Sequence, residues 1–190
     1  GMGAQPLYQV DLAVFDPAGR QVSASTRRIG LRTVELVRDR DAKGRAFGFR
    51  VNGRVVFAKG ASLIPMDIFP GQESAAHRDR LMVMARDAGM NMVRVWGGGL
   101  YESDALYDRA DELGLMIWQD FAFGGPVPPP DAAYAENARQ EAHEQILRLR
   151  HHPSLVLWCG NNEVQTGWDS WPDRKEYARA IGPAQRAVVV

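Results

Sequence analysis

The chain has 190 residues, 45% of them hydrophobic and 24% charged, with a formal net charge of +0 at pH 7. This is the composition of an ordinary soluble globular protein, and its charge balance argues against binding to nucleic acid or electrostatic anchoring to a membrane. No apolar run is long enough to span a membrane, and the single cysteine, Cys159, excludes an intramolecular disulfide. The start, Gly1-Met2-Gly3, suggests that the natural N-terminus and any targeting signal are absent, so the compartment stays open.

Residues 1–45 have the pattern of antiparallel strands. Hydrophobic and polar residues alternate from Tyr8 to Val14 and again from Ile29 to Val37, as in half-buried strands. Between these runs, Asp16-Pro17-Ala18-Gly19 is a turn signal. A segment this short cannot form a β-sandwich alone. We therefore predict the last strands of a sandwich that needs partner strands, followed by a charged linker from Asp39 to Arg45.

Residues 46–190 change to alternating strands and helices. Asn52-Gly53 between two apolar runs first predicts a hairpin. Apolar runs typical of buried strands recur at 55–60, 91–96, 114–119 and 154–159, with helical patterns at 78–89, 103–113 and 131–150. Such a succession of βαβ units forms a parallel sheet with right-handed crossovers.

Four such strands are half of an eight-stranded β/α barrel. A complete barrel takes about 250 residues, whereas 145 follow Arg45, from 190 minus 45. An open doubly wound sheet is the alternative, but Lys59-Gly60-Ala61-Ser62 is not the Gly-rich phosphate loop expected after its first strand. We predict an α/β chain: the N-terminal half of a (β/α)8 TIM barrel in residues 46–190, preceded by β-sandwich strands in residues 1–45.

Polar or aromatic side chains stand at the ends of these strands, where the active sites of β/α barrels lie. The second strand ends at Trp96, followed by three glycines that clear space and let the backbone turn. Trp96 could stack on a sugar ring, or it could plug the core. Arg94 lies inside this strand and needs an anionic partner if it is buried.

The third and fourth strands end in carboxyl groups. Asp120 could accept hydrogen bonds from substrate hydroxyls, or it could pair with Arg94 or cap a helix. Asn162 and Glu163 follow the fourth strand directly. Glu163 could act as a general acid, a base or a nucleophile, or it could be a solvated loop carboxylate. The histidines have no metal-ligand spacing with neighbouring carboxylates or thiolates, so we expect no metal site.

Five sequence blocks resemble glycoside hydrolase family 2, and specifically its β-mannosidase branch. The last two blocks are the most specific, whereas Asn-Glu alone is shared by many barrel glycosidases. The blocks are Gln5 to Tyr8, Arg28 to Arg32, Phe49 to Gly53 with Phe57 to Ala61, Met92 to Glu102, and Trp158 to Glu163.

The resemblance implies an immunoglobulin-like β-sandwich that ends near residue 40, followed by a TIM barrel. It implies a retaining exo-hydrolase that removes terminal β-D-mannose, without a metal or organic cofactor. In this likeness Glu163 is the acid/base carboxyl and Asn162 contacts the 2-hydroxyl of the sugar. Trp96 and Asp120 line the site for the terminal sugar.

Two departures and one absence qualify the resemblance. The block Ala61 to Asp67 lacks the tryptophan usual in the family, and Phe123-Gly124-Gly125 replaces bulkier residues, so the preferred sugar is in question. The family's nucleophile is a glutamate late in the barrel, and we assign that role to no residue of this chain. We therefore expect the isolated chain to be inactive and its incomplete barrel to self-associate. Another family 2 activity (β-glucosaminidase, β-galactosidase or β-glucuronidase) and a non-catalytic carbohydrate-binding fragment are the alternatives.

Overall fold

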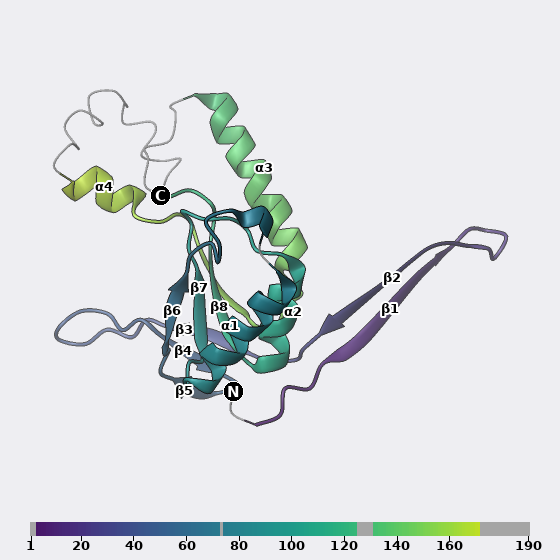
Figure 1. The fold of residues 1–190 in the computed structure, drawn as a ribbon, viewed down its shortest axis with the longest axis horizontal. Coiled ribbons are helices and arrows are strands. Elements are labelled where there is room, and N and C mark those ends of the chain that lie inside the picture. Colours follow the sequence, from purple (N-terminus) through teal and green to yellow (C-terminus); the bar gives the residue numbers. More distant parts are fainter. Residues whose placement is uncertain (1–2, 73, 125–130, 172–190) are drawn as a thin grey trace.

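The computed structural model describes residues 3–72, 74–124 and 131–171 (Figure 1). Within these ranges the strands form three separate sheets: a hairpin of two strands, an antiparallel sheet of three and a parallel sheet of four. The hairpin projects away from the rest of the molecule, and the helices lie around the parallel sheet (Figure 1).

The projecting hairpin consists of β1 (Tyr8–Phe15) and β2 (Gln21–Ile29), paired antiparallel. Its turn is held by Asp16, whose Oδ1 accepts hydrogen bonds from the backbone N–H groups of Ala18 and Arg20 at 3.0 and 2.9 Å. The predicted strand from Tyr8 and the predicted turn are thus confirmed. Apolar side chains on this ribbon stay exposed, including Leu12 and Val14 at 58% and 55%, as expected of a ribbon that lacks partner strands.

The predicted second alternating strand, from Ile29 to Val37, is wrong. β2 ends at Ile29, and the later residues enter a different sheet as β3 (Val34–Val37). The chain between these two strands contacts the start of the last parallel strand. Arg32 donates hydrogen bonds to the carbonyl groups of Pro153 and Leu155 at 3.0 and 2.7 Å, and partial burial lowers the pKa of its guanidinium.

The three-stranded sheet has the order β3, β4 (Gly48–Val51), β5 (Arg54–Val56). Asn52 and Gly53 have φ angles of 48° and 75°. Positive φ at both central residues marks the type I′ turn that favours two-residue hairpins, so the predicted hairpin is confirmed. The expected boundary between residues 45 and 46 falls in the loop that joins β3 to β4.

The parallel sheet has the order β6 (Gly60–Leu63), β7 (Met92–Val95), β8 (Met116–Asp120), β9 (Leu155–Cys159). Three strands lie close to the predicted ranges, but the first does not begin at residue 55. Val55 and Val56 pair with β4 instead, so the parallel strand starts at Gly60. A Cβ at Gly60 would stand 1.8 Å from the carbonyl oxygen of Met92, so the close approach of β6 to β7 requires a glycine.

Helices fill the intervals between the parallel strands, as predicted. They are α1 (Ala75–Asp87) after the short 3-10 turn η1 (Pro70–Gln72), α2 (Asp104–Leu113), α3 (Ala132–Leu149), and the short α4 (Val164–Ser170) beyond the last strand. Asp131 caps α3 by accepting a hydrogen bond from the N–H of Tyr134 at 2.7 Å. Gly114 ends α2 in the left-handed conformation, with φ of 68°.

The core lies between the helices and one face of the parallel sheet. It includes Val93, Val95 and Ile117 from the strands and Leu106 and Tyr107 from α2. The alternate residues Arg94 and Trp118, which are paired in register, are only partly buried. The sheet is therefore packed on its helical side and open on the other.

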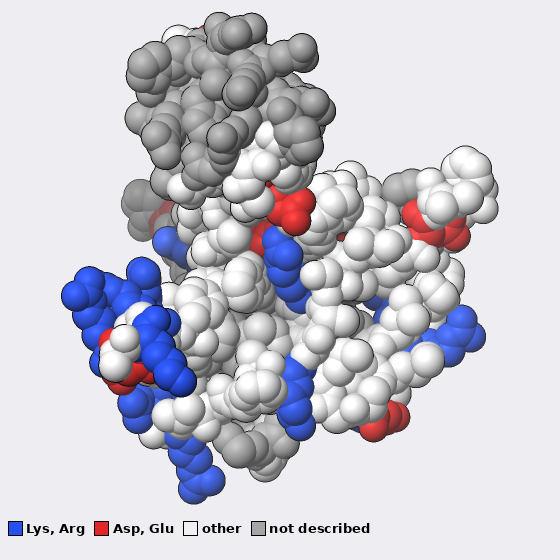
Figure 2. Space-filling view, turned by 90° about the vertical axis from the view of Figure 1, so that its left-hand side faces the viewer, with Lys and Arg blue, Asp and Glu red and all other residues white. Residues whose placement is uncertain are grey.

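Apolar side chains in β5 and in the segments before and after β6 are uncovered. Val55, Phe57, Ile64 and Ile68 are between 60% and 89% exposed. Figure 2, which looks onto the side that carries β6, shows mostly uncharged surface in the middle of that face, interrupted by basic side chains. The α/β class and the βαβ order of the prediction are confirmed. Among the described residues, none of the helices has the length and apolar character needed to cross a bilayer.

Candidate active site

The four residues predicted for the site come together at the carboxyl end of the parallel sheet. Asp120 is the last residue of β8, and Trp96 follows β7 directly. Asn162 and Glu163 stand between β9 and α4, and an isolated bridge pairs Asn162 with Gly124 beyond β8. The ends of three neighbouring strands thus meet around these side chains.

Asp120 is the most constrained of the four, with 1% of its surface exposed. Its Oδ2 accepts hydrogen bonds from Arg94 Nη2 at 2.6 Å and from the N–H of Gly97 at 3.1 Å. Its Oδ1 accepts from Arg94 Nε at 3.2 Å and from Trp118 Nε1 at 3.0 Å. Both carboxylate oxygens therefore have protein donors. Of the alternatives for Asp120, the pairing with Arg94 is the one observed.

Arg94 connects Asp120 to the last strand end. Besides its two bonds to Asp120, its Nη2 donates to Asn162 Oδ1 at 2.8 Å. The hydrogen bond with Asp120, the largest influence, raises the pKa of this guanidinium, which stays charged in any case. The partner that the position of Arg94 requires is thus present, and the same side chain also holds Asn162.

Asn162 is buried, with 6% of its surface exposed. Its backbone N–H donates to the carbonyl of Phe123 at 2.9 Å, and its Oδ1 accepts from Arg94. Its Nδ2 makes no hydrogen bond to the described part of the chain. The amide group is therefore held at one end, with its donor end available to a ligand.

Glu163 has an exposed side chain and a left-handed backbone, with φ of 59°. It stands at the N-cap of α4, yet its carboxylate does not cap that helix. Asn161 does so instead, because its Oδ1 accepts from the N–H of Val164 at 3.1 Å. A non-glycine residue in this conformation is uncommon and typical of functional turns, and here it leaves the carboxylate without a structural hydrogen bond at the helix end.

Trp96 lies partly buried over the glycine loop. A Cβ at Gly98 would stand 2.2 Å from the Trp96 ring, and one at Gly124 would stand 2.7 Å from Gly98 Cα. A Cβ at Gly97 would meet the carbonyl oxygen of Phe121 at 2.6 Å. The glycines therefore let the loop, the indole ring and the end of β8 approach one another closely.

Sequence reasoning missed the role of Trp118, which donates to Asp120 from two residues away on the same face of β8. The period of two in a strand could have indicated it. It also missed Tyr101, whose hydroxyl accepts from the N–H of Ala122 at 3.1 Å and donates to Glu141 at 2.8 Å. Burial raises the pKa of Tyr101, so this hydroxyl stays protonated and ties α3 to the loop beyond β8.

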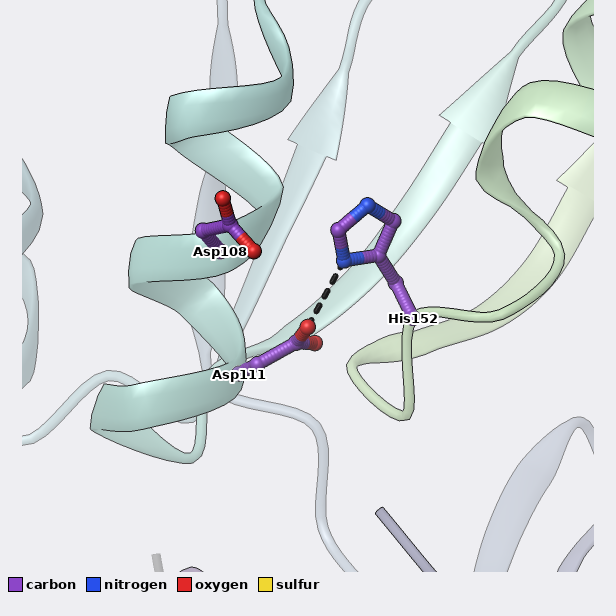
Figure 3. A group of neighbouring side chains, drawn as sticks. All are labelled: Asp108, Asp111 and His152. Atoms are coloured by element: carbon purple, nitrogen blue, oxygen red, sulfur yellow. Dashed lines mark hydrogen bonds and ion pairs between the residues drawn. The ribbon is translucent and has the colours of Figure 1, made fainter. Parts of the chain in front are cut away.

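A second group of ionisable side chains lies at the opposite end of the sheet, before β9. His152 Nδ1 is 2.7 Å from Asp111 Oδ2, and Asp108 lies beside them (Figure 3). Sequence spacing did not reveal this cluster, because the histidine and the aspartates come from different elements. However, Asp111 also accepts from the N–H of Ser154 at 2.9 Å, and Asp108 pairs with Arg28 at 3.1 Å. These bonds give the cluster a structural role, joining α2 to β9 and to the hairpin.

Comparisons with known proteins bear on this site. A β-mannosidase of Bos taurus is 39% identical over 174 residues, covering 88% of this chain and 20% of the relative. β-Mannosidase B of Aspergillus terreus is 42% identical over 166 residues, covering 86% of this chain and 19% of the relative. No protein-family model matches the chain. The chain thus spans about a fifth of the length of the curated relatives it matches.

Solved structures show the same similarity to β-mannosidases. The crystal structure of a β-D-mannosidase from Dictyoglomus thermophilum matches with a TM-score of 0.84 and 41% identity, over 98% of this chain and 24% of that one. A β-glucuronidase of Parabacteroides merdae matches with a TM-score of 0.76 at 24% identity, over 97% of this chain and 21% of that one, which shows a shared fold.

The fold and the strand ends define an α/β chain with polar side chains gathered at the carboxyl end of its parallel sheet. The sequence relatives and the Dictyoglomus structure make it more specific: the chain is β-mannosidase-like, of the glycoside hydrolase family 2 type.

Proposed function

We propose that this chain is part of a retaining exo-glycosidase that releases terminal β-D-mannose from the non-reducing ends of carbohydrates. The observation that carries the proposal is the strand end at Asn162 and Glu163. It presents a free amide donor beside an exposed carboxylate in a chain that is 38–42% identical to several β-mannosidases. In this reading Glu163 is the general acid and base, and Asn162 binds the 2-hydroxyl of the sugar.

The mechanism needs a second carboxylate. A retaining glycosidase places its two carboxyl groups about 5–5.5 Å apart, one as nucleophile and one as acid and then base. Glu163 would protonate the glycosidic oxygen and later deprotonate the attacking water. Its acid role also requires a partly buried or negatively charged setting. Glu163 is exposed here, so we propose that later parts of the complete protein supply both the nucleophile and this setting.

The architecture proposed for the complete protein follows the same logic. The open side of the parallel sheet and the unpaired edge at β6 would be covered by four further strands that close a TIM barrel. The exposed hairpin β1–β2 would pair with other strands of an immunoglobulin-like β-sandwich ending near residue 40. The site then lies at the carboxyl end of the closed barrel, where Trp96 lines the pocket and Asp120 acts through Arg94 and Asn162.

A panel of aryl glycosides tests the substrate. We expect the complete protein to release the aryl alcohol fastest from the β-mannoside, ahead of the β-glucosaminide, β-galactoside and β-glucuronide. The isolated 190 residues, which contribute one of the two required carboxylates, are expected to be inactive on all four. Faster turnover of another glycoside would reassign the sugar, and turnover by the isolated chain would place the nucleophile within it. If the complete protein is inactive but binds mannose in calorimetry, the carbohydrate-binding alternative holds.

We further propose that the isolated chain self-associates through its uncovered apolar groups. Phe57 and Ile68 are 81% and 89% exposed, and within the described residues β6 and β9 are the edges of the parallel sheet. Exposed edges and apolar patches of this kind favour association. Light scattering on the purified chain is expected to show mass increasing with concentration. A monomer at high concentration contradicts this.

A further inference from the structure

The orientation of the Asn162 amide is decided by Arg94. Arg94 Nη2 lies 2.8 Å from the Asn162 side chain, and a guanidinium can only donate hydrogen bonds. The atom it contacts must therefore be the oxygen, and the amide nitrogen must face the other way. The oxygen and nitrogen of an amide can often be exchanged without a clear preference. Here the exchange is excluded, because the guanidinium of Arg94 can only donate.

Arg94 is itself held in one position. Two of its nitrogens bind the two oxygens of Asp120, the planar, bidentate geometry that a guanidinium and a carboxylate favour. Asp120 is in turn fixed by Trp118 and by the N–H of Gly97. Donors from β8 and the glycine loop thus fix the Asp120 carboxylate, and this carboxylate in turn determines where the guanidinium of Arg94 lies.

We propose that Arg94 is a positioning residue that presents Asn162 to the substrate as a hydrogen-bond donor and not as an acceptor. Nδ2 then donates to the oxygen of the sugar 2-hydroxyl. Hydrogen bonds to this hydroxyl strengthen in the transition state of glycoside cleavage, so a correctly oriented donor raises kcat. This inference rests on the proposed glycosidase function and adds Arg94 and Asp120 to it as residues that act through Asn162.

The test compares two substrates in the complete protein. Arg94→Lys keeps the positive charge beside Asp120 but cannot bind Asp120 bidentately while also holding Asn162. We expect it to lower kcat/KM on the aryl β-mannoside about 10- to 100-fold, the effect of one misdirected hydrogen bond near charged groups. On the aryl 2-deoxy-β-glycoside, which lacks the hydroxyl that Asn162 reads, we expect a loss of less than about threefold.

A double mutant tests whether Arg94 acts through Asn162. If Arg94 acts through Asn162, then Arg94→Lys combined with Asn162→Ala loses little more than Asn162→Ala alone, because the two changes remove the same interaction. Arg109→Lys is the matched control, since Arg109 of α2 pairs with Asp79 of α1 and Glu112 of α2. It is expected to leave the ratio of the two substrates unchanged.

Asn162→Asp supports the test if Arg94→Lys does not fold, as judged by its thermal midpoint. The aspartate can still accept from Arg94 but has no donor, so it should lose activity on the mannoside and little on the 2-deoxy substrate. Equal losses on both substrates, with additive effects in the double mutant, overturn the role of Arg94 while leaving the glycosidase function intact. A wild-type protein inactive on every glycoside overturns the proposed function, and the inference with it.

Discussion

Replacing Glu163 with glutamine in the complete protein is expected to lower turnover of an aryl β-mannoside about 10²- to 10⁴-fold, the usual contribution of a general acid and base. Glutamine has nearly the same shape but cannot donate or take up the proton. The change should leave the fold intact, because the side chain is exposed and makes no capping bond to α4. Glutamine has the same unbranched Cβ and Cγ as glutamate, so we expect it to keep the left-handed backbone of this position.

The choice of leaving group distinguishes the loss of a proton donor from a general loss of activity. An aryl alcohol that is already acidic needs little help from a proton donor, so Glu163→Gln should slow cleavage of such a mannoside far less than that of one with a weakly acidic leaving group. Glu144→Gln is the matched control, because Glu144 is an exposed carboxylate on α3 that pairs only with Gln140 among the described residues. Undiminished turnover in Glu163→Gln would remove Glu163 from the acid/base role.

The parallel sheet could be predicted because strands β7, β8 and β9 are apolar runs bounded by turn residues. In addition, Asp131 caps α3, and glycines with positive φ follow α1 and α2. The first strand was misplaced because Val55 and Val56 are as apolar as a buried strand. Only the pairing of β4 with β5 through the Asn52-Gly53 turn assigns them to the hairpin. Pairing partners are a tertiary property that an apolar run does not reveal.

The candidate active site, like the fold, could be predicted only in part. Local sequence indicated that Asp120, Asn162 and Glu163 stand at strand ends, because each directly follows an apolar run. It could not distinguish an Asp120 that binds a sugar from one that binds Arg94, since that depends on a contact between β7 and β8 across 26 positions of sequence. The sequence pattern also could not predict that Arg94 holds Asn162, which is 68 positions away.

The second large effect is expected from Gly97→Ala, which adds a single methyl group between the ends of the strands. Its Cβ would stand 2.6 Å from the carbonyl oxygen of Phe121 and 3.1 Å from Asp120 Cβ. Backbone atoms cannot swing aside as a flexible side chain can, so the ends of β7 and β8 must separate. Overpacking of this kind costs about 1–3 kcal/mol of stability, and it strains the hydrogen bond from Gly97 to Asp120.

The loss of activity should exceed the loss of stability. Moving Asp120 moves Arg94 and, through it, the amide of Asn162, and a displacement of about 1 Å in a catalytic arrangement can cost about 10²-fold in rate. Gly160→Ala is the matched control: it lies at the end of β9, and an added Cβ there meets no atom within 4 Å among the described residues. Thermal midpoints and kcat/KM on the aryl β-mannoside are measured for both variants in the complete protein. We expect Gly160→Ala to match the wild type and Gly97→Ala to lose about 10²-fold in kcat/KM while remaining folded. If the two variants prove equally active, the strand ends are not as tightly joined through Asp120 as these contacts require.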